Sequence, residues 1–263
     1  MNNKYNVYLI SDLHGDSRPV RDFWLRAKLS EKMAEKDNVL ICLGDFGGNF
    51  YFNHRDKNFK EKLGKYPFTY FVIRGNHEER PSICIEKNLN EWHYEMFFNN
   101  YVLVENAYPH IKYAWDCPFT YIINGYKTMV FPGAYSVDKY HRLQMGWSWF
   151  EHEQLTEKEM KIGREMVIMN KNKCDLVLSH TCPIMFEPTD LFLPHVDQSM
   201  VDKTMERYLG EIEFNLDYKA WCWGHFHQHR EYPRTDGRRR LMLMHDLVRL
   251  EDVINSTDIV EKL

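Results

Sequence analysis

The sequence predicts an α/β fold, in which buried strands alternate with helices along the chain. The apolar run Tyr5–Ile10 ends abruptly at polar residues, which is typical of a buried strand that gives way to a loop. A helix is expected next, because Val20, Phe23 and Trp24 recur at the spacing of one helical face. Asn38–Leu43 is then the next predicted strand, and the order strand, helix, strand indicates an α/β domain.

The rest of the chain continues this alternation and adds two hairpins. Asn124-Gly125 and Asp236-Gly237 are two-residue turn signals, so the segments beside each are predicted to pair as antiparallel strands. The segment Arg80–Pro118 has mixed periodicity and predicts no definite element. The further strands expected are Phe68–Ile73, Phe119–Ile123, Lys127–Phe131, Asp175–Leu178, Lys219–Trp223 and Leu241–Met244, with a hairpin over Glu231–Arg240 and helices over Glu153–Asn170 and Gln198–Leu209.

Length and composition bound the class of protein. The chain has 263 residues, 44% apolar and 27% charged, which fits one domain over residues 1–263 and excludes a disordered or fibrous chain. No run approaches the ~18 apolar residues of a membrane span, so no membrane partner is expected. The first residues lack a signal-peptide pattern, and the six cysteines are scattered, which predicts reduced thiols and a cytoplasmic location.

Five of the predicted strands end in residues that can bind a metal ion. Ligands of open α/β sheets gather at the carboxyl ends of the strands, so these residues are expected to converge although they are far apart in sequence. Carboxylate, imidazole and amide groups suit Mn²⁺, Fe, Zn²⁺ or Mg²⁺. The five blocks are Asp12-Leu13-His14, Gly44-Asp45, Gly75-Asn76-His77-Glu78, Ser179-His180 and Gly224-His225-Phe226-His227.

These blocks resemble the signature of the calcineurin-like metallophosphoesterases, which runs D-x-H, G-D-x-x-G, G-N-H-E, an isolated H and G-H-x-H. All five occur here in the family's order, between residues 12 and 227, each behind an apolar strand. The resemblance is to bacterial or phage-type members, with partial similarity to the Ser/Thr protein phosphatases. It implies a four-layer α/β/β/α sandwich of two facing mixed β-sheets flanked by helices, with the metal site at one sheet edge.

The resemblance also implies a dinuclear centre in which Asp45 bridges two divalent metal ions. Manganese is the expected metal, and iron, zinc or nickel are the alternatives. Two ions (+4), two carboxylates (−2) and a bridging hydroxide (−1) leave +1, which favours an anionic phosphate ester. The first ion would be held by Asp12, His14, Asp45 and His227, and the second by Asp45, Asn76, His180 and His225.

The activity that the resemblance implies is hydrolysis of a phosphate ester by in-line attack of the bridging hydroxide. Asp45 and His77 would be the catalytic residues, and His77 would donate a proton to the leaving alkoxide or stabilise transition-state charge. We expect a phosphomonoesterase acting on a phosphorylated small molecule, a nucleotide or a phosphoprotein. The alternatives are a nucleotide phosphodiesterase and a non-catalytic interaction module that keeps the fold. The net charge of −4 disfavours a nuclease or another nucleic-acid partner.

The second block departs from the protein-phosphatase pattern G-D-x-V-D-R-G. Gly48 stands in place of the acid that pairs with the catalytic histidine, and Asn49 stands in place of a phosphate-binding arginine. Both departures argue against a phosphoprotein substrate. Arg74 argues for one, because it precedes the third block as a phosphate-contacting arginine does in those phosphatases.

The expected substrate contacts are Arg74, Asn49, Arg142 and Tyr135. Arg142 follows Gly133–Lys139, a segment similar to one in bacterial and phage members, and would contact phosphate. Tyr135 would stack on the leaving group. The proline-containing segment 181–197 follows a proposed ligand and would form one wall of the cleft. For His77, the expected orienting partner is Glu78 or Asp16.

Other polar and aromatic residues have simpler explanations. Trp147-Ser148-Trp149-Phe150 is expected to pack instead of stacking on bases, and Arg238-Arg239-Arg240 to form a solvated hairpin end. Cys222 is expected to pack inside its strand. Eight further histidines are expected to be ordinary surface or core groups: His54, His93, His110, His141, His152, His195, His229 and His245. Of these, His229 and His245 are the ones most expected to have a role at the site.

Overall fold

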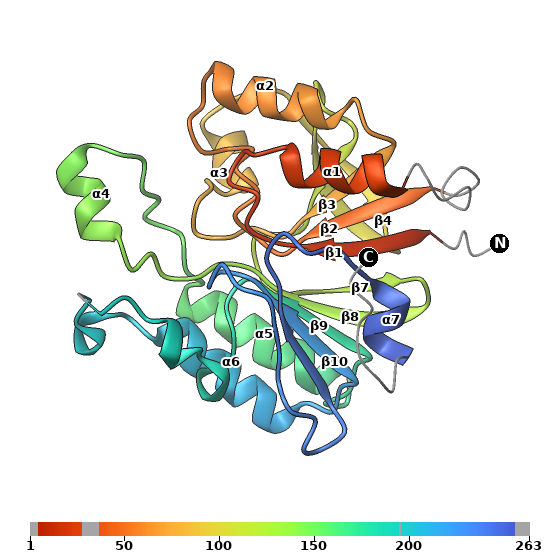
Figure 1. Ribbon diagram of the computed structural model, residues 1–263, viewed down its shortest axis with the longest axis vertical. Coiled ribbons are helices and arrows are strands. Elements are labelled where there is room, and N and C mark those ends of the chain that lie inside the picture. Colours follow the sequence, from red (N-terminus) through yellow and green to blue (C-terminus); the bar gives the residue numbers. More distant parts are fainter. Residues whose placement is uncertain (1–4, 28–36, 195, 256–263) are drawn as a thin grey trace.

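Two mixed β-sheets lie face to face, and helices cover their outer faces (Figure 1). The structure is a computed structural model that describes residues 5–27, 37–194 and 196–255. The predicted four-layer α/β/β/α sandwich is therefore confirmed. Within the described residues, no helix combines the length and the apolar character needed to cross a membrane.

The first sheet has seven strands, in the order β13-β1-β2-β3-β6-β5-β4. Its centre is parallel, whereas β4, β5 and β13 pair in the antiparallel sense. The strands are β1 (Asn6–Ile10), β2 (Asn38–Cys42), β3 (Phe68–Val72), β4 (Trp92–Phe97), β5 (Asn100–Glu105), β6 (Ile111–Tyr113) and β13 (Val248–Arg249).

The second sheet has six strands, in the order β11-β12-β10-β9-β8-β7. Strands β8, β9, β10 and β12 are parallel, and a hairpin partner pairs antiparallel at each edge. The strands are β7 (Phe119–Ile123), β8 (Tyr126–Phe131), β9 (Leu176–Ser179), β10 (Ala220–Trp223), β11 (Arg230–Glu231) and β12 (Arg239–Met242).

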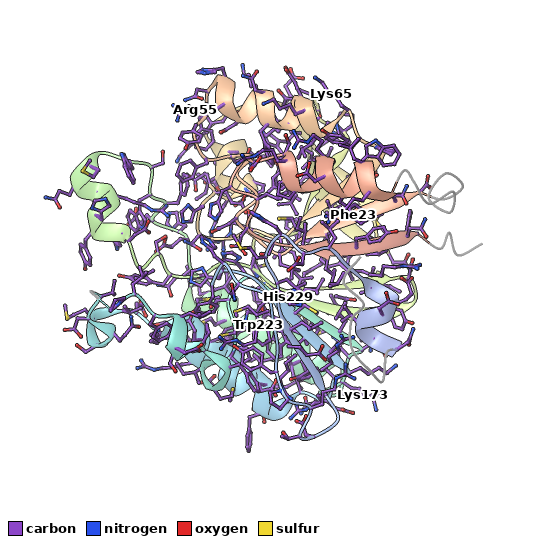
Figure 2. The ribbon with its side chains drawn as sticks, in the orientation of Figure 1. Phe23, Arg55, Lys65, Lys173, Trp223 and His229 are labelled. Atoms are coloured by element: carbon purple, nitrogen blue, oxygen red, sulfur yellow. The ribbon has the colours of Figure 1, made fainter. Side chains whose placement is uncertain are left out.

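Side-chain alternation along the strands produces three apolar layers. In β1, Val7 and Leu9 face the core between the sheets, whereas Tyr8 and Ile10 face the helices α1 (Arg18–Ala27) and α2 (His54–Leu63). On the second sheet, Trp221 packs outward against α5 (Glu157–Met169) and α6 (Thr204–Asn215). Figure 2 labels Phe23 and Trp223 in the two outer layers. The carboxyl ends of the parallel strands of both sheets are thereby held at fixed positions.

Three shorter helices complete the described fold. α3 (Pro81–Glu86) follows the third motif block, and α7 (Leu250–Asn255) packs at the end of the core between the sheets. α4 (Lys139–Met145) stands out from the two-sheet body in Figure 1. Single 3-10 turns lie at Ile184–Phe186, Thr189–Leu191 and Gln198–Met200.

The strands expected from the sequence are confirmed to within a few residues, but the helices need correction. Gln198–Leu209 is not one helix: it begins as a 3-10 turn, and α6 starts only at Thr204. The helix expected from residue 153 begins at Glu157, where Thr156 and Glu159 form a capping box. The unassigned segment Arg80–Pro118 contains α3 and the strands β4, β5 and β6. The sequence analysis also missed α2, α4 and α7.

A buried ion pair joins α2 to β5. The Lys60 Nζ atom lies 2.5 Å from Glu105 Oε2, and both side chains are almost wholly excluded from water (4% and 3% exposed). The same ammonium donates to the Asn49 amide oxygen at 2.9 Å. Because each charge is desolvated, each depends on the other for compensation.

Lys60→Met should lower the free energy of unfolding by about 3–5 kcal/mol, because it leaves the Glu105 carboxylate buried without its cation. The double variant Lys60→Met/Glu105→Leu should recover most of that loss. Urea denaturation followed by circular dichroism measures both. If the double variant were as unstable as Lys60→Met, the loss of stability would not come from an unpaired Glu105 carboxylate, which would contradict the prediction.

Candidate metal centre

The five motif blocks meet where the carboxyl ends of the two sheets come together. β1, β2 and β3 of the first sheet lead into the first three blocks, and β9 and β10 of the second lead into the last two. The first, second and fifth blocks turn sharply off their strands. Five residues other than glycine there have positive φ angles: Asp12 (58°), His14 (46°), Asp45 (50°), His225 (71°) and His227 (53°). Residues other than glycine rarely adopt this conformation, so the site stores backbone strain.

The first group of ligand atoms comes from both sheets. His14 Nε2 lies 2.9 Å from His227 Nε2 and 3.7 Å from Asp45 Oδ2. His227 Nε2 lies 3.6 Å from Asp12 Oδ1. One ligand atom from each of these four residues falls within 4.8 Å of the other three. The four residues expected to hold the first ion are therefore brought together.

The second group lies on the other side of Asp45. His180 Nε2 is 3.2 Å from Asp45 Oδ1 and 2.9 Å from the amide oxygen of Asn76. The same amide oxygen is 3.0 Å from His225 Nδ1. Ligands about 2.0–2.2 Å from one ion lie roughly 3 Å apart, which is the spacing seen in both groups. Each oxygen of the Asp45 carboxylate faces a different group, as a bridging ligand requires.

Two glycines make room for the Asp45 carboxylate and for the His180 ring. A Cβ at Gly75 would collide with Asp45 Oδ1, and a Cβ at Gly44 would collide with the His180 ring. Gly44 also has a φ of 105°, which other residues rarely adopt. The backbone N–H of His77 donates to Asp45 Oδ1 at 2.8 Å and fixes the orientation of the carboxylate.

Surrounding groups orient the ligands. His180 Nδ1 lies 2.7 Å from the carbonyl oxygen of Leu43, so Nδ1 holds a proton and Nε2 faces the second group, where a cation would replace the second proton of the ring. His245, expected to be an ordinary histidine, has its Nε2 2.9 Å from the carbonyl oxygen of Asp12. It supports the first block from the loop after β12.

The orientation of the Asn76 amide is fixed by a buried chain of hydrogen bonds that the sequence analysis missed. Asn76 Nδ2 donates to Ser136 Oγ at 2.9 Å, and Ser136 Oγ donates to Glu153 Oε2 at 2.5 Å. Glu153 also accepts from the Ser136 backbone N–H and from Trp149 Nε1, both at 3.0 Å. Because the amide nitrogen is held by Ser136, the amide oxygen must face His180 and His225.

The protonation states suit cation binding. Burial lowers the pKa of His14 to about 4 and lowers the pKa values of His225 and His227, so these rings are neutral with free lone pairs. Burial raises the pKa of Asp12 to about 7. Although burial opposes it, the Asp45 carboxylate raises the pKa of His180 to about 9. Two buried carboxylates thus lie among mostly neutral rings, where cations would compensate their charge.

His77 and Arg142 lie together at the edge of the ligand groups. Arg142 Nη2 contacts both ring nitrogens of His77, Nε2 most closely and Nδ1 at 2.9 Å, and Arg142 Nε donates to Asp138 Oδ2 at 2.8 Å. Arg142 is 2% exposed, and its Nη1 has no hydrogen-bond partner among the described residues. Arg142 therefore presents one free N–H edge beside His77.

Neither of the partners expected for His77 touches its ring in the described structure. The Glu78 carboxylate accepts from the backbone N–H groups of Gly47 (3.1 Å) and Gly75 (2.9 Å), and so ties the second block to the third. Asp16 pairs with Arg18 instead. Arg142 takes the place beside the His77 ring.

The other three residues expected to contact substrate lie in different surroundings. Tyr135 lines a cavity of about 400 Å³ together with Asp45, Asn76 and His225, and residues 187–193 form its wall. Arg74 is buried and donates to the carbonyl oxygen of Glu153 at 2.6 Å. Asn49 is buried against Lys60. Neither Arg74 nor Asn49 lines a described cavity at the site, and their contact with substrate stays a prediction.

The structure also shows the surroundings of the arginine stretch and of Cys222. The stretch Arg238-Arg239-Arg240 is not a solvated hairpin end, because Arg239 and Arg240 are each 3% exposed and pair with Glu231 and Glu213. Cys222 is buried in β10, as expected. His195 lies outside the described residues.

Comparison with known proteins agrees with this geometry. The chain matches the sequence profile of the calcineurin-like phosphoesterases over residues 5–229, which includes all five blocks. The chain belongs to the calcineurin-like phosphoesterase family. It is therefore a metal-dependent phosphoesterase; the family uses a dinuclear divalent metal centre, and Asp12, His14, Asp45 and His227 form a cluster that could bind a metal ion. No curated protein sequence matches the chain.

Several solved structures are similar to this chain at low sequence identity. A dimetal phosphatase from Danio rerio aligns with a TM-score of 0.51 and 11% identity, covering 92% of this chain and 88% of its own. The phosphopantetheinyl hydrolase of Mycobacterium tuberculosis aligns with a TM-score of 0.45 and 14% identity, covering 93% and 91%. A 5′-nucleotidase from Candida albicans aligns with a TM-score of 0.43 and 16% identity, covering 93% of this chain and 46% of its own.

Asp45→Asn should reduce Mn²⁺ binding by this phosphoesterase from two ions per chain to one or none, and should abolish turnover, because one carboxylate serves both ligand groups. Metal analysis after equilibrium dialysis gives the stoichiometry. Asp16→Asn makes the same chemical change on a neighbouring loop and should still bind two. Two tightly bound ions in Asp45→Asn would contradict the bridging role.

Ser136→Ala should weaken the second Mn²⁺ site by roughly 10- to 100-fold and leave the first unchanged, because the Asn76 amide loses the group that fixes its orientation. Titration calorimetry separates the two events. Ser199→Ala, a surface change, is the control. Equal weakening of both sites would indicate a general loss of structure instead.

Proposed function

We propose that this phosphoesterase is a phosphomonoesterase. The supporting observation is the buried guanidinium of Arg142, which lies beside His77 with its Nη1 free of any partner among the described residues. A monoester is a dianion near neutral pH, whereas a diester carries one charge. A fixed cation at the reacting centre therefore favours the monoester.

The reaction proposed is hydrolysis to an alcohol and inorganic phosphate. When bound, two divalent cations, for which manganese is our proposal, would acidify a water molecule and neutralise phosphate charge. Arg142 would hold a non-bridging phosphate oxygen through Nη1. As the bond from the water oxygen to phosphorus forms, the bond from phosphorus to the leaving oxygen breaks. The leaving oxygen takes up a proton, for which we propose His77 as the donor.

Two further observations support this proposal. The complete ligand set and the retained His77 argue against a non-catalytic module, because a scaffold has no need of them. The six cysteines form no disulfide in the structure, which supports a reducing, cytoplasmic location.

The test is hydrolysis of p-nitrophenyl phosphate and of bis-p-nitrophenyl phosphate by metal-stripped protein resupplied with Mn²⁺. We expect the monoester to be preferred. Arg142→Ala should lower kcat/KM for the monoester by roughly 10- to 100-fold, the effect of losing a charged hydrogen bond, and the diester value by much less.

Lys158→Ala, a cationic position on α5 that lines no described cavity, is the control for Arg142→Ala. A wild-type preference for the diester would instead favour a nucleotide phosphodiesterase. An equal loss on both esters in Arg142→Ala would remove this guanidinium from recognition of the dianion.

His77→Ala should keep both metal ions and slow the chemical step. The loss should be greater for alkyl phosphates than for p-nitrophenyl phosphate, because a poor leaving group needs the proton more. Single-turnover rates over a series of leaving groups measure this. The same fractional loss for every leaving group would rule out proton donation.

A further inference from the structure

A second cavity, here called the outer cavity, opens beside His77 and the ligand residue His14. It has a volume of about 580 Å³ and is lined by His14, Phe50, Tyr51, His77, Arg142 and Trp147, together with Arg55. His77 also lines the cavity beside Tyr135, but among the described cavities only the outer one contains Arg142. If His77 protonates the leaving oxygen while Arg142 holds the phosphate, the leaving group binds in the outer cavity, an assignment that rests on the proposed phosphomonoesterase activity.

The walls of the outer cavity present aromatic ring faces. Phe50 stacks on the His77 ring at 5.8 Å with an interplanar angle of 18°. Tyr51 and Trp147 line the cavity and are 44% and 56% exposed, so Trp147 is not packed as its sequence segment was expected to be. Exposed ring faces at a ligand cavity favour a planar group, since stacking on a base or aromatic ring tolerates many orientations.

The outer cavity also contains a cation beyond Arg142. The Arg55 guanidinium lies 4.7 Å from the Tyr51 ring centroid, and no carboxylate among the described residues forms an ion pair with it. Figure 2 labels Arg55 on α2. A guanidinium held over an aromatic face keeps its N–H edge available for an anion.

Arg55 also lines an adjoining groove of about 300 Å³, together with His54 and Lys62. The groove therefore contains a second cationic side chain, that of Lys62. The carboxylate in this groove, Asp56, accepts backbone N–H groups of residues 50–52 at 2.8–3.0 Å and so holds the aromatic loop in place. Asp138, in the outer cavity, is paired with Arg142. The free charge along this surface is therefore cationic.

We propose that the leaving group is a nucleoside that carries a second phosphate. Its base stacks on the exposed rings of Tyr51 and Trp147, and its second phosphate binds Arg55. A phosphorylated sugar has no planar group for these rings. A phosphoserine or phosphothreonine side chain brings no planar group of its own to these rings.

The experiment compares phosphate release from glycerol 2-phosphate, adenosine 5′-monophosphate, adenosine 3′,5′-bisphosphate and a phosphotyrosine peptide. In the wild type, kcat/KM should be about 10-fold higher for the bisphosphate than for the monophosphate. Arg55→Ala should remove that ratio. Trp147→Ala should lower the ratio of nucleotide to glycerol phosphate activity by about 10-fold.

Matched controls are Lys57→Ala, a cation on the same helix that lines no described cavity, and Phe214→Ala, an exposed aromatic on α6. Neither should change the ratios. Release from glycerol phosphate without a preference for nucleotides would overturn this proposal alone, and so would a bisphosphate ratio unchanged in Arg55→Ala. Preference for the peptide would replace the nucleoside by a tyrosine side chain. No release from any monoester by metal-loaded protein would overturn the phosphomonoesterase proposal itself.

Discussion

The meeting of Asp45 and His180 across the two sheets is the interaction on which the rest of the site depends. Asp45 follows β2 of the first sheet and His180 follows β9 of the second, and their side chains lie 3.2 Å apart in a place closed to water. A buried carboxylate is tolerated only where positive charge compensates it. The fold thus creates a demand for cations at the point where the two sheets join, and the other ligands surround that point.

Backbone strain accompanies this arrangement. Positive φ angles at residues such as Asp12 and His227 cost of order 1–3 kcal/mol each, and they persist only where the surroundings determine them. Here the parallel strands fix where each block begins, and the hydrogen bonds to Leu43, Ser136 and Asp12 fix how the ligands point. The rigid part of the site is therefore the metal centre. The cavities beside it, lined by α4 and by loops, are where substrate preference can vary.

The sequence predicted which candidate ligands lie together better than it predicted their surroundings, for a physical reason. Strand ends and ligand chemistry are local signals, so Asp12, Asn76 and His225 could be assigned from their own segments. The surroundings of Arg74 and Asn49 could not be predicted, because the direction of a side chain depends on packing against distant elements, here the Glu153 loop and Lys60. Ser136 and Glu153 act through a contact 17 residues apart in sequence that no periodicity shows. Helix α4 is too short to produce a periodic signal, although it carries Arg142.

The central claim is that one carboxylate, Asp45, joins two cation sites built from both sheets. Anomalous diffraction from crystals soaked in Mn²⁺ tests it most directly. The account predicts two peaks about 3.5–4 Å apart on opposite sides of the Asp45 carboxylate. One should lie next to His14 and His227, and the other next to Asn76 and His180. A single peak, or two peaks that do not share Asp45, would contradict it.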